Sequence, residues 1–148
     1  MRGLREAVRD TTGRGAGRKR GGTAMSLILI VEDNEKNMKL VRDVLQAKGY
    51  ATVEAVTGED GVRLAAERKP DLILMDIQLP GISGIEALRQ LRANRETATI
   101  PAVAVTASVM QQDRKQITEA GFNGYLRKPI NLKEFLETVR AMLEGGRE

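Results

Sequence analysis

The chain has 148 residues and contains neither cysteine nor histidine. These absences exclude disulfides, cysteine-ligated zinc, HExxH metal sites, thiolate nucleophiles and Ser-His-Asp triads, so chemistry must come from carboxylates, hydroxyls, amines and backbone groups. The net charge of +4 is uneven, because residues 1–24 hold seven basic and two acidic residues and the remainder is close to neutral.

Residues 1–24 are rich in Gly and Arg and show no hydrophobic periodicity, so they are predicted to form a disordered basic extension before one folded domain over 25–148. The extension is either an inert, solvated segment, which we favour, or a basic arm for nucleic acid or an acidic membrane surface. Nucleic-acid binding is expected to be weak at most, since four aromatic residues are too few for a base-stacking platform. No apolar stretch approaches the roughly 20 residues that span a bilayer.

From residue 25 the chain alternates short apolar runs with amphipathic segments. Runs rich in β-branched residues predict strands buried in a parallel sheet, and helical spacing of apolar residues predicts helices. The predicted strands cover 27–31, 52–56, 72–75, 102–106 and 124–126, and the predicted helices cover 34–48, 58–68, a segment marked by apolar residues at 85, 88 and 91, 111–120 and 132–143. Thr57 is predicted to cap the second helix, and strand 52–56 to lie near an edge. Five strand–helix units predict an α/β fold, a doubly wound, five-stranded parallel sheet with helices on both faces.

Acidic side chains follow two of the predicted strands. Glu32 and Asp33 come directly after the first strand, and Asp76 follows the third. Ligand sites of open parallel sheets lie outside the carboxyl ends of the strands, so the three carboxylates are expected to meet if these strands are neighbours. Two carboxylates about 4 Å apart repel by about 4 kcal/mol at an effective dielectric constant near 20, and a proton, a lysine or a metal ion must offset this repulsion. The sequence therefore predicts an acidic, cation-binding pocket.

Two further strand ends carry groups suited to phosphoryl chemistry. Thr106 ends the fourth strand, and Lys128 follows the fifth, where Pro129 restricts its backbone. The strand ends carry, in order, Val-Glu-Asp-Asn (31–34), Leu-Met-Asp-Ile-Gln-Leu-Pro (74–80), Val-Thr-Ala (105–107) and Arg-Lys-Pro-Ile (127–130). With these motifs, residues 26–143 resemble the receiver domain of two-component response regulators, which has the flavodoxin- or CheY-like (βα)5 fold. Within the family, the likeness is greatest to the stand-alone, single-domain DivK-like type, through residues 31–38 and 75–80.

The resemblance implies a role for each acidic residue. Asp76 would be the phosphoacceptor, a carboxylate nucleophile that attacks a phosphohistidine of a partner and becomes an acyl phosphate. Asp33, Asp76 and the backbone carbonyl of Gln78 would ligate Mg²⁺, which prefers oxygen ligands and keeps several waters. Glu32 occupies the family's first acidic position and would contact the metal through water.

The remaining groups would position the phosphoryl group and transmit its presence. By resemblance, Lys128 would pair with Asp76 and later with the phosphoryl oxygens, and Thr106 would donate its hydroxyl to one of them. Signalling would run through Thr106 and Tyr125, whose inward turn would reshape the face formed by the fourth helix, fifth strand and fifth helix. Gln78 and Ser108 stand at positions that tune self-hydrolysis in the family.

The implied partners are a histidine kinase or histidine phosphotransfer protein and a downstream protein target. A homodimer through the face of the fourth helix, fifth strand and fifth helix is also consistent with the family. Phosphotransfer modifies the chain itself and is followed by slow self-dephosphorylation, so we do not expect a turnover enzyme. The expected location is the cytoplasm, without membrane attachment.

Other interpretations compete with these roles. Asp76 could be a turn residue, Glu32 and Asp33 could only cap the first helix, Thr106 could be an N-cap, and Lys128 could be a solvated lysine. Tyr125 is predicted equally well to be a core residue. The fold as a whole could be a constitutive binding module, or a Mg²⁺-dependent phosphatase of the aspartyl-nucleophile type. The phosphatase is disfavoured because its chemistry usually needs a second Asp where Gln78 stands, and the constitutive module is disfavoured because all the key groups of a receiver are present.

Overall fold

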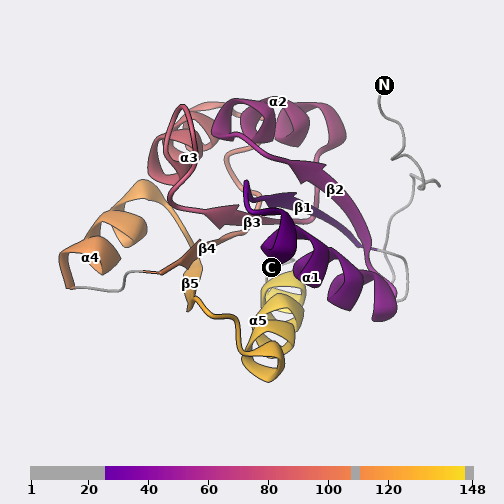
Figure 1. Ribbon diagram of the computed structural model, residues 1–148. Coiled ribbons are helices and arrows are strands. Elements are labelled where there is room, and N and C mark those ends of the chain that lie inside the picture. The colour runs from indigo at the N-terminus through magenta and orange to yellow at the C-terminus, as the bar shows by residue number, and fades with distance from the viewer. Residues whose placement is uncertain (1–25, 108–110, 146–148) are drawn as a thin grey trace.

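A computed structural model describes residues 26–107 and 111–145 of the chain. Strands and helices alternate strictly along the described chain, as the apolar runs and amphipathic segments require (Figure 1). The strands are β1 (Leu27–Val31), β2 (Ala51–Ala55), β3 (Leu72–Asp76), β4 (Ala102–Thr106) and β5 (Gly124–Arg127). The helices are α1 (Glu35–Ala47), α2 (Gly58–Arg68), α3 (Gly84–Ala93), α4 (Gln111–Ala120) and α5 (Leu132–Gly145).

The strands form one parallel sheet in the order β2-β1-β3-β4-β5. Strand order reverses at β1, which pairs with β2 on one side and β3 on the other, so the carboxyl ends of β1 and β3 lie next to each other. This is the arrangement that places a crevice at the switch point of a doubly wound sheet. The predicted fold class is confirmed, and β2 lies at an edge as expected.

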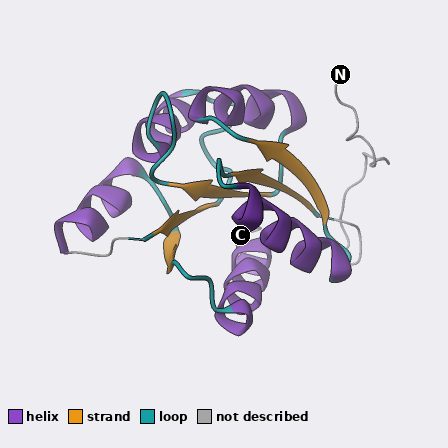
Figure 2. Cartoon of the chain, viewed as in Figure 1, coloured by secondary structure: helices purple, strands orange, loops and turns teal. Residues whose placement is uncertain are grey.

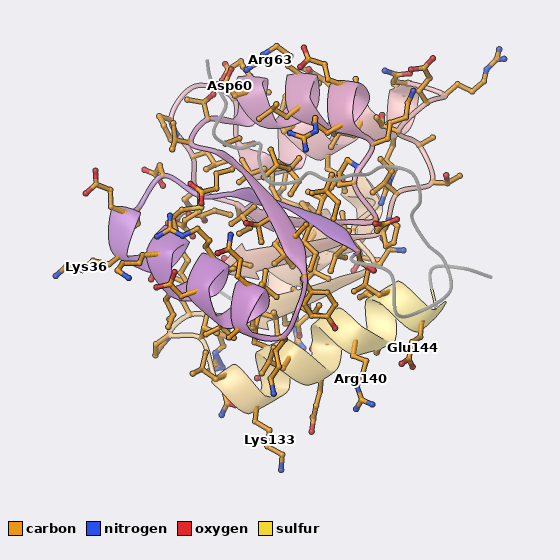
Figure 3. All side chains as sticks on the ribbon, turned by 90° about the vertical axis from the view of Figure 1, so that its right-hand side faces the viewer. Lys36, Asp60, Arg63, Lys133, Arg140 and Glu144 are labelled. Atoms are coloured by element: carbon orange, nitrogen blue, oxygen red, sulfur yellow. The ribbon has the colours of Figure 1, made fainter. Side chains whose placement is uncertain are left out.

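Helices cover both faces of the sheet (Figures 1 and 2). On one face, side chains of α2, α3 and α4 pack on the sheet in a cluster that includes Met75, Leu88 and Ile117. On the other face, α1 and α5 contribute Leu45 and Phe135 to a second cluster. Burial on both faces explains why β1 and β3 read as uninterrupted apolar runs. The outer surfaces of the helices carry charged side chains such as those labelled in Figure 3.

The helix starts follow from short polar side chains. Asn34 caps α1 by accepting a hydrogen bond from the Asn37 N–H at 3.0 Å, and Thr57 caps α2 by accepting one from the Asp60 N–H at 3.1 Å. Each cap satisfies one of the amide groups that a helix start leaves without an intrahelical partner. The cap predicted at Thr57 is confirmed. Strand β2 begins and ends one residue earlier than predicted, and Val56, outside it, is 54% exposed.

Among the described residues, no helix combines the length and the apolar composition that crossing a membrane would need. The predicted disorder of residues 1–24 concerns a segment outside the described part of the chain.

Candidate functional site

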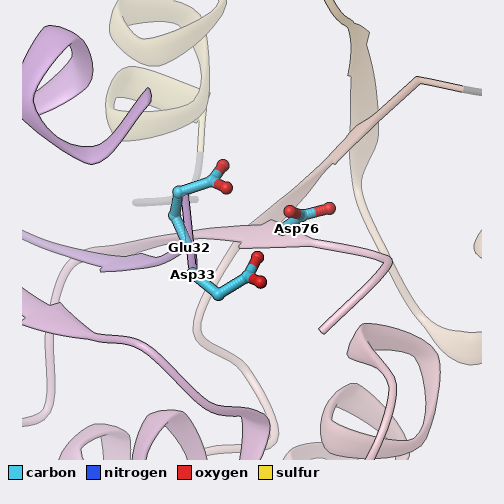
Figure 4. Close-up of side chains that lie close together, drawn as sticks. All are labelled: Glu32, Asp33 and Asp76. Atoms are coloured by element: carbon cyan, nitrogen blue, oxygen red, sulfur yellow. The ribbon is translucent and has the colours of Figure 1, made fainter. Parts of the chain in front are cut away.

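Three carboxylates meet where β1 and β3 end. Val31 pairs with Met75 in the register of the two strands, which brings the residues after them, Glu32 and Asp76, to the same edge of the sheet. Glu32, Asp33 and Asp76 each place a carboxylate oxygen so that the three atoms lie within 4.8 Å of one another (Figure 4). Glu32 and Asp76 are each only 4% exposed, whereas Asp33 is exposed. The acidic pocket expected at this edge is therefore formed.

Lys128 brings a cation to this cluster from the end of β5. Its Nζ lies 3.0 Å from Asp76 Oδ2 and 3.4 Å from Glu32 Oε1. Its backbone N–H donates to the carbonyl of Thr106 at 2.9 Å, and this bond continues the pairing of β4 with β5 past their last residues. Lys128 is thus an ion-pair partner of two acidic residues and not a solvated loop lysine.

The carboxylate of Asp76 is held on both of its oxygens. Oδ2 faces Lys128, and Oδ1 accepts a hydrogen bond from the backbone N–H of Gln78 at 3.0 Å. The loop after β3 turns back sharply, since the Gly84 N–H donates to the Ile77 carbonyl at 2.9 Å. A Cβ at Gly84 would lie 2.3 Å from the carbonyl oxygen of Asp76, so α3 can begin this close to the site only with a glycine.

Burial and neighbouring charges shift the pKa values of Glu32 and Lys128. Burial is the largest effect on Glu32 and raises its pKa; the Asn34 N–H and Lys128 act in the opposite direction, and the nearby Asp76 adds to the increase. For Lys128, burial lowers the pKa, but Asp76 and Glu32 together outweigh it and the pKa is raised. Lys128 therefore stays charged, and the cluster retains an excess of negative charge that a bound cation would offset.

The cluster opens into a cleft of about 620 Å³. Its lining is polar and combines the residues that follow β1, the end of β3 with the loop after it, the first turn of α1, and the start of the loop that connects β5 to α5. The lining residues are Glu32, Asp33, Asn34, Glu35, Lys36, Asn37, Asp76, Gln78 and Lys128. Closely spaced carboxylate oxygens at an open cleft suit Mg²⁺, which takes a few carboxylates and keeps waters. The residues present therefore fit this ion.

The geometry shows which residue caps α1. The cap of α1 is Asn34, not Glu32 or Asp33; instead, Glu32 Oε2 accepts a hydrogen bond from the Asn34 N–H at 3.1 Å. A polar residue directly before an acidic first turn is the sequence signal that would have found this cap.

The two residues predicted to form the switch, Thr106 and Tyr125, differ in burial. Thr106 ends β4 and is 3% exposed. Tyr125 is 37% exposed, and its hydroxyl accepts a hydrogen bond from Arg114 Nη1 at 3.0 Å, so it is a surface residue of β5 and not part of the core. Ser108 lies outside the described residues.

Known proteins resemble this chain in sequence and in fold. Residues 28–140 match the family model of the response regulator receiver domain. The chain belongs to the response regulator receiver family. It is 47% identical over 116 residues to the polar-differentiation response regulator DivK of Brucella ovis, which covers 78% of this chain and 94% of that protein.

Solved receiver structures superpose on the fold. The receiver domain of the sensor histidine kinase PA1611 from Pseudomonas aeruginosa, solved with a magnesium ion coordinated in its active-site cleft, is 35% identical with a TM-score of 0.77 and covers 82% of this chain and 99% of that one. The chemotaxis protein CheY4 of Vibrio cholerae is 25% identical with a TM-score of 0.77, and the match covers 80% of this chain and 99% of that chain. This receiver is therefore a response regulator of phosphorelay signalling, with the CheY-like fold.

Proposed function

We propose that Asp76 is the phosphoacceptor of this receiver and that Mg²⁺ binds beside it. The observation that carries the proposal is the setting of the Asp76 carboxylate. It is almost fully buried, is fixed by Lys128 and the Gln78 N–H, and lies within 4.8 Å of oxygens of Glu32 and Asp33. A buried carboxylate held in one orientation at the floor of an open cleft is suited to in-line attack on phosphorus.

The chemistry is a displacement at phosphorus. An oxygen of Asp76 forms the new bond to phosphorus as the bond to the donor breaks, and the donor leaves with the bonding electrons. Asp33, Asp76 and the Gln78 carbonyl are proposed to hold Mg²⁺ directly, and Glu32 through water; the ion would neutralise charge on the phosphoryl oxygens. The ammonium of Lys128 can follow the charge from the Asp76 carboxylate to the new phosphoryl group, and Thr106 can donate its hydroxyl to that group.

The phosphorylated state would be read by other proteins. The proposed partners are a histidine kinase or histidine phosphotransfer protein as donor and a downstream target that recognises the face formed by α4, β5 and α5. The domain assignment, with a receiver over 25–148 after a basic extension, stays a proposal, and so do dimerisation through α4, β5 and α5 and a cytoplasmic location. The chain is proposed to modify itself and not to turn over a substrate. Any nucleic-acid binding would be weak and come from the extension.

The test is the mass of the intact protein after incubation with acetyl phosphate, with and without Mg²⁺. We expect one added phosphoryl group that requires Mg²⁺, is absent in Asp76→Asn and persists in the control Asp43→Asn, an exposed residue of α1. If no adduct forms, beryllofluoride binding is measured next, because rapid self-hydrolysis would hide the phosphorylated form. Failure of both, or phosphorylation of Asp76→Asn, would overturn the proposal.

A further inference from the structure

Arg92, in the last turn of α3, is a half-buried cation outside the site described above. No carboxylate lies within ion-pair distance of it among the residues that the structure describes. Burial lowers its pKa, and no neighbouring acid offsets this effect. A guanidinium that is partly desolvated without an anionic partner is costly unless its N–H groups find other acceptors. The hydrogen-bond acceptors of Arg92 therefore identify the segments that this side chain connects.

The guanidinium donates to four oxygens on two separate loops. Nη1 donates to the carbonyls of Thr97 and Ala98, at 3.3 and 3.0 Å, in the loop before β4. Nε and Nη2 both donate to the carbonyl of Gly121, at 3.2 and 3.1 Å, and Nη2 also donates to Asn123 Oδ1 at 3.1 Å. Gly121 follows the last residue of α4, so Arg92 connects the end of α3 to the end of α4 and to the loop before β4.

The close approach of Arg92 leaves little room for a side chain at Gly121. The φ of Gly121 is +109°, a conformation that favours glycine, and a Cβ there would lie 3.0 Å from Cγ and 3.1 Å from Nε of Arg92. Asn123 extends the connection, because its Oδ1 also accepts a hydrogen bond from the Ala102 N–H and its own N–H donates to the Ala102 carbonyl. The turn after α4 is therefore held by both Arg92 and the first residue of β4.

Beyond a hydrogen bond from Arg114 to Tyr125 and two buried apolar residues, few other contacts hold the described part of α4. It is the most polar of the helices, and of its residues 114–120 only Ile117 and Ala120 are buried. It has no basic residue in its own last turn, where a positive charge would be favourable beside the free carbonyl groups. Arg92 supplies that charge from α3.

We propose that Arg92 anchors the carboxyl end of α4 to α3, so that this end stays fixed when the receiver is activated. The second half of this inference rests on the proposed function, in which phosphorylation reshapes the surface that contains α4. If the anchor persists, α4 can change position only by turning about Gly121, with its first turn moving most. Arg92 is thus a positioning residue that determines which end of the switch helix can move.

Amide hydrogen exchange tests the anchor without any phosphoryl group. The Phe122 N–H donates to the Ile117 carbonyl and the Asn123 N–H to the Ala102 carbonyl, so both amides report on the turn after α4. In Arg92→Met, which keeps an apolar stem and removes the donors, we expect both amides to exchange about tenfold faster or more. The amide of Ile73 in β3 reports overall stability and should change less. Equal acceleration at all three amides would overturn the anchor.

Two further variants serve as controls in this hydrogen-exchange test. Arg89→Met removes a cation from α3 one turn earlier, where the side chain is exposed and makes no described hydrogen bond or ion pair, and it should leave the exchange of Phe122 and Asn123 unchanged. Arg92→Lys keeps the charge but cannot reach both loops at once, so an intermediate acceleration is expected. It also provides the measurement if Arg92→Met does not fold, and wild-type exchange in Arg92→Lys would overturn the anchor.

Activation of the wild-type protein with beryllofluoride and Mg²⁺ tests whether the carboxyl end of α4 stays fixed. The exchange rates of the Phe122 and Asn123 amides should stay within about threefold of those in the unactivated protein. Loss of their protection would mean that the carboxyl end of α4 moves, and would overturn this half of the inference. If beryllofluoride does not bind, the proposed function is refuted, and so is the proposal that the carboxyl end of α4 stays fixed on activation. The anchor in the unactivated protein is tested separately, by the exchange rates of the Arg92 variants.

Discussion

Replacing Lys128 by methionine would remove the one cation that the described structure places against the buried carboxylates. Its Nζ lies 3.0 Å from Asp76 Oδ2 and 3.4 Å from Glu32 Oε1, and each interaction corresponds to about 5 kcal/mol at an effective dielectric constant near 20. The cost of desolvating the three groups offsets much of this attraction, and water in the open cleft screens it further. Because two buried carboxylates would be left without their partner, we expect the free energy of unfolding at neutral pH to fall by about 3 kcal/mol.

The loss should depend on pH in a direction set by Glu32. Its pKa is already raised by burial, and loss of the attraction to Lys128 would raise it further. A carboxyl group with a higher pKa in the folded chain contributes stability below its unfolded pKa, and this contribution is lost as the pH rises through the folded pKa. The loss of unfolding free energy in Lys128→Met should therefore be largest at about pH 8 and become smaller toward about pH 5. Mg²⁺ should restore more stability to the variant than to the wild type, because it replaces the missing positive charge.

Urea denaturation at both pH values, with and without Mg²⁺, measures these effects. Lys39→Met is the matched control, since Lys39 forms an exposed pair with Asp43 on α1 and its loss should change stability by no more than about 0.5 kcal/mol. A deficit below about 1 kcal/mol for Lys128→Met, or one that does not change with pH, would refute the electrostatic account of the cluster.

Three other substitutions test the site and its frame. Glu32→Gln should weaken Mg²⁺ binding about tenfold in calorimetry, as expected for loss of a group that acts on the ion through water, and unchanged affinity would exclude such a role. Gly84→Ala places a Cβ 2.3 Å from the Asp76 carbonyl oxygen, so the unfolding free energy should fall by about 2 kcal/mol and phosphorylation by acetyl phosphate should slow. Thr57→Ala removes the cap of α2 and should lower the urea midpoint by the equivalent of about 1 kcal/mol without affecting phosphorylation; an unaltered midpoint would contradict the capping role.

Local patterns predicted what depends on neighbouring residues in the chain. The apolar runs of β1 and β3 and the cap at Thr57 could be read from a few adjacent positions, and the acids at the strand ends followed from the parallel sheet. The resemblance to receivers then gave the site residues their roles. What remained hidden involves contacts between distant segments.

Two contacts show this limit. Lys128 pairs with Glu32 across 96 positions as well as with Asp76, and spacing alone does not reveal that one lysine serves two acids. Arg92 donates to oxygen atoms of residues 5 to 31 positions away, and nothing in the composition of α3 separates it from the exposed Arg89. The one-residue shift of β2 has a similar origin, because its limits are set by pairing with β1 and not by its own weak apolar pattern.

Among the residues that the structure describes, the strand order leaves β2 and β5 with one unpaired edge each. Exposed strand edges are templates for association with other chains, and proteins counter this with short edge strands that carry charge. Here β2 has five residues with exposed Glu54, and β5 has four with exposed Arg127. Like charges on like edges oppose pairing of β2 with β2 and of β5 with β5 between molecules, and the short length of both strands limits pairing of β2 with β5. We therefore expect a protein that resists edge-to-edge aggregation, although the surface proposed to change on phosphorylation includes one of these edges.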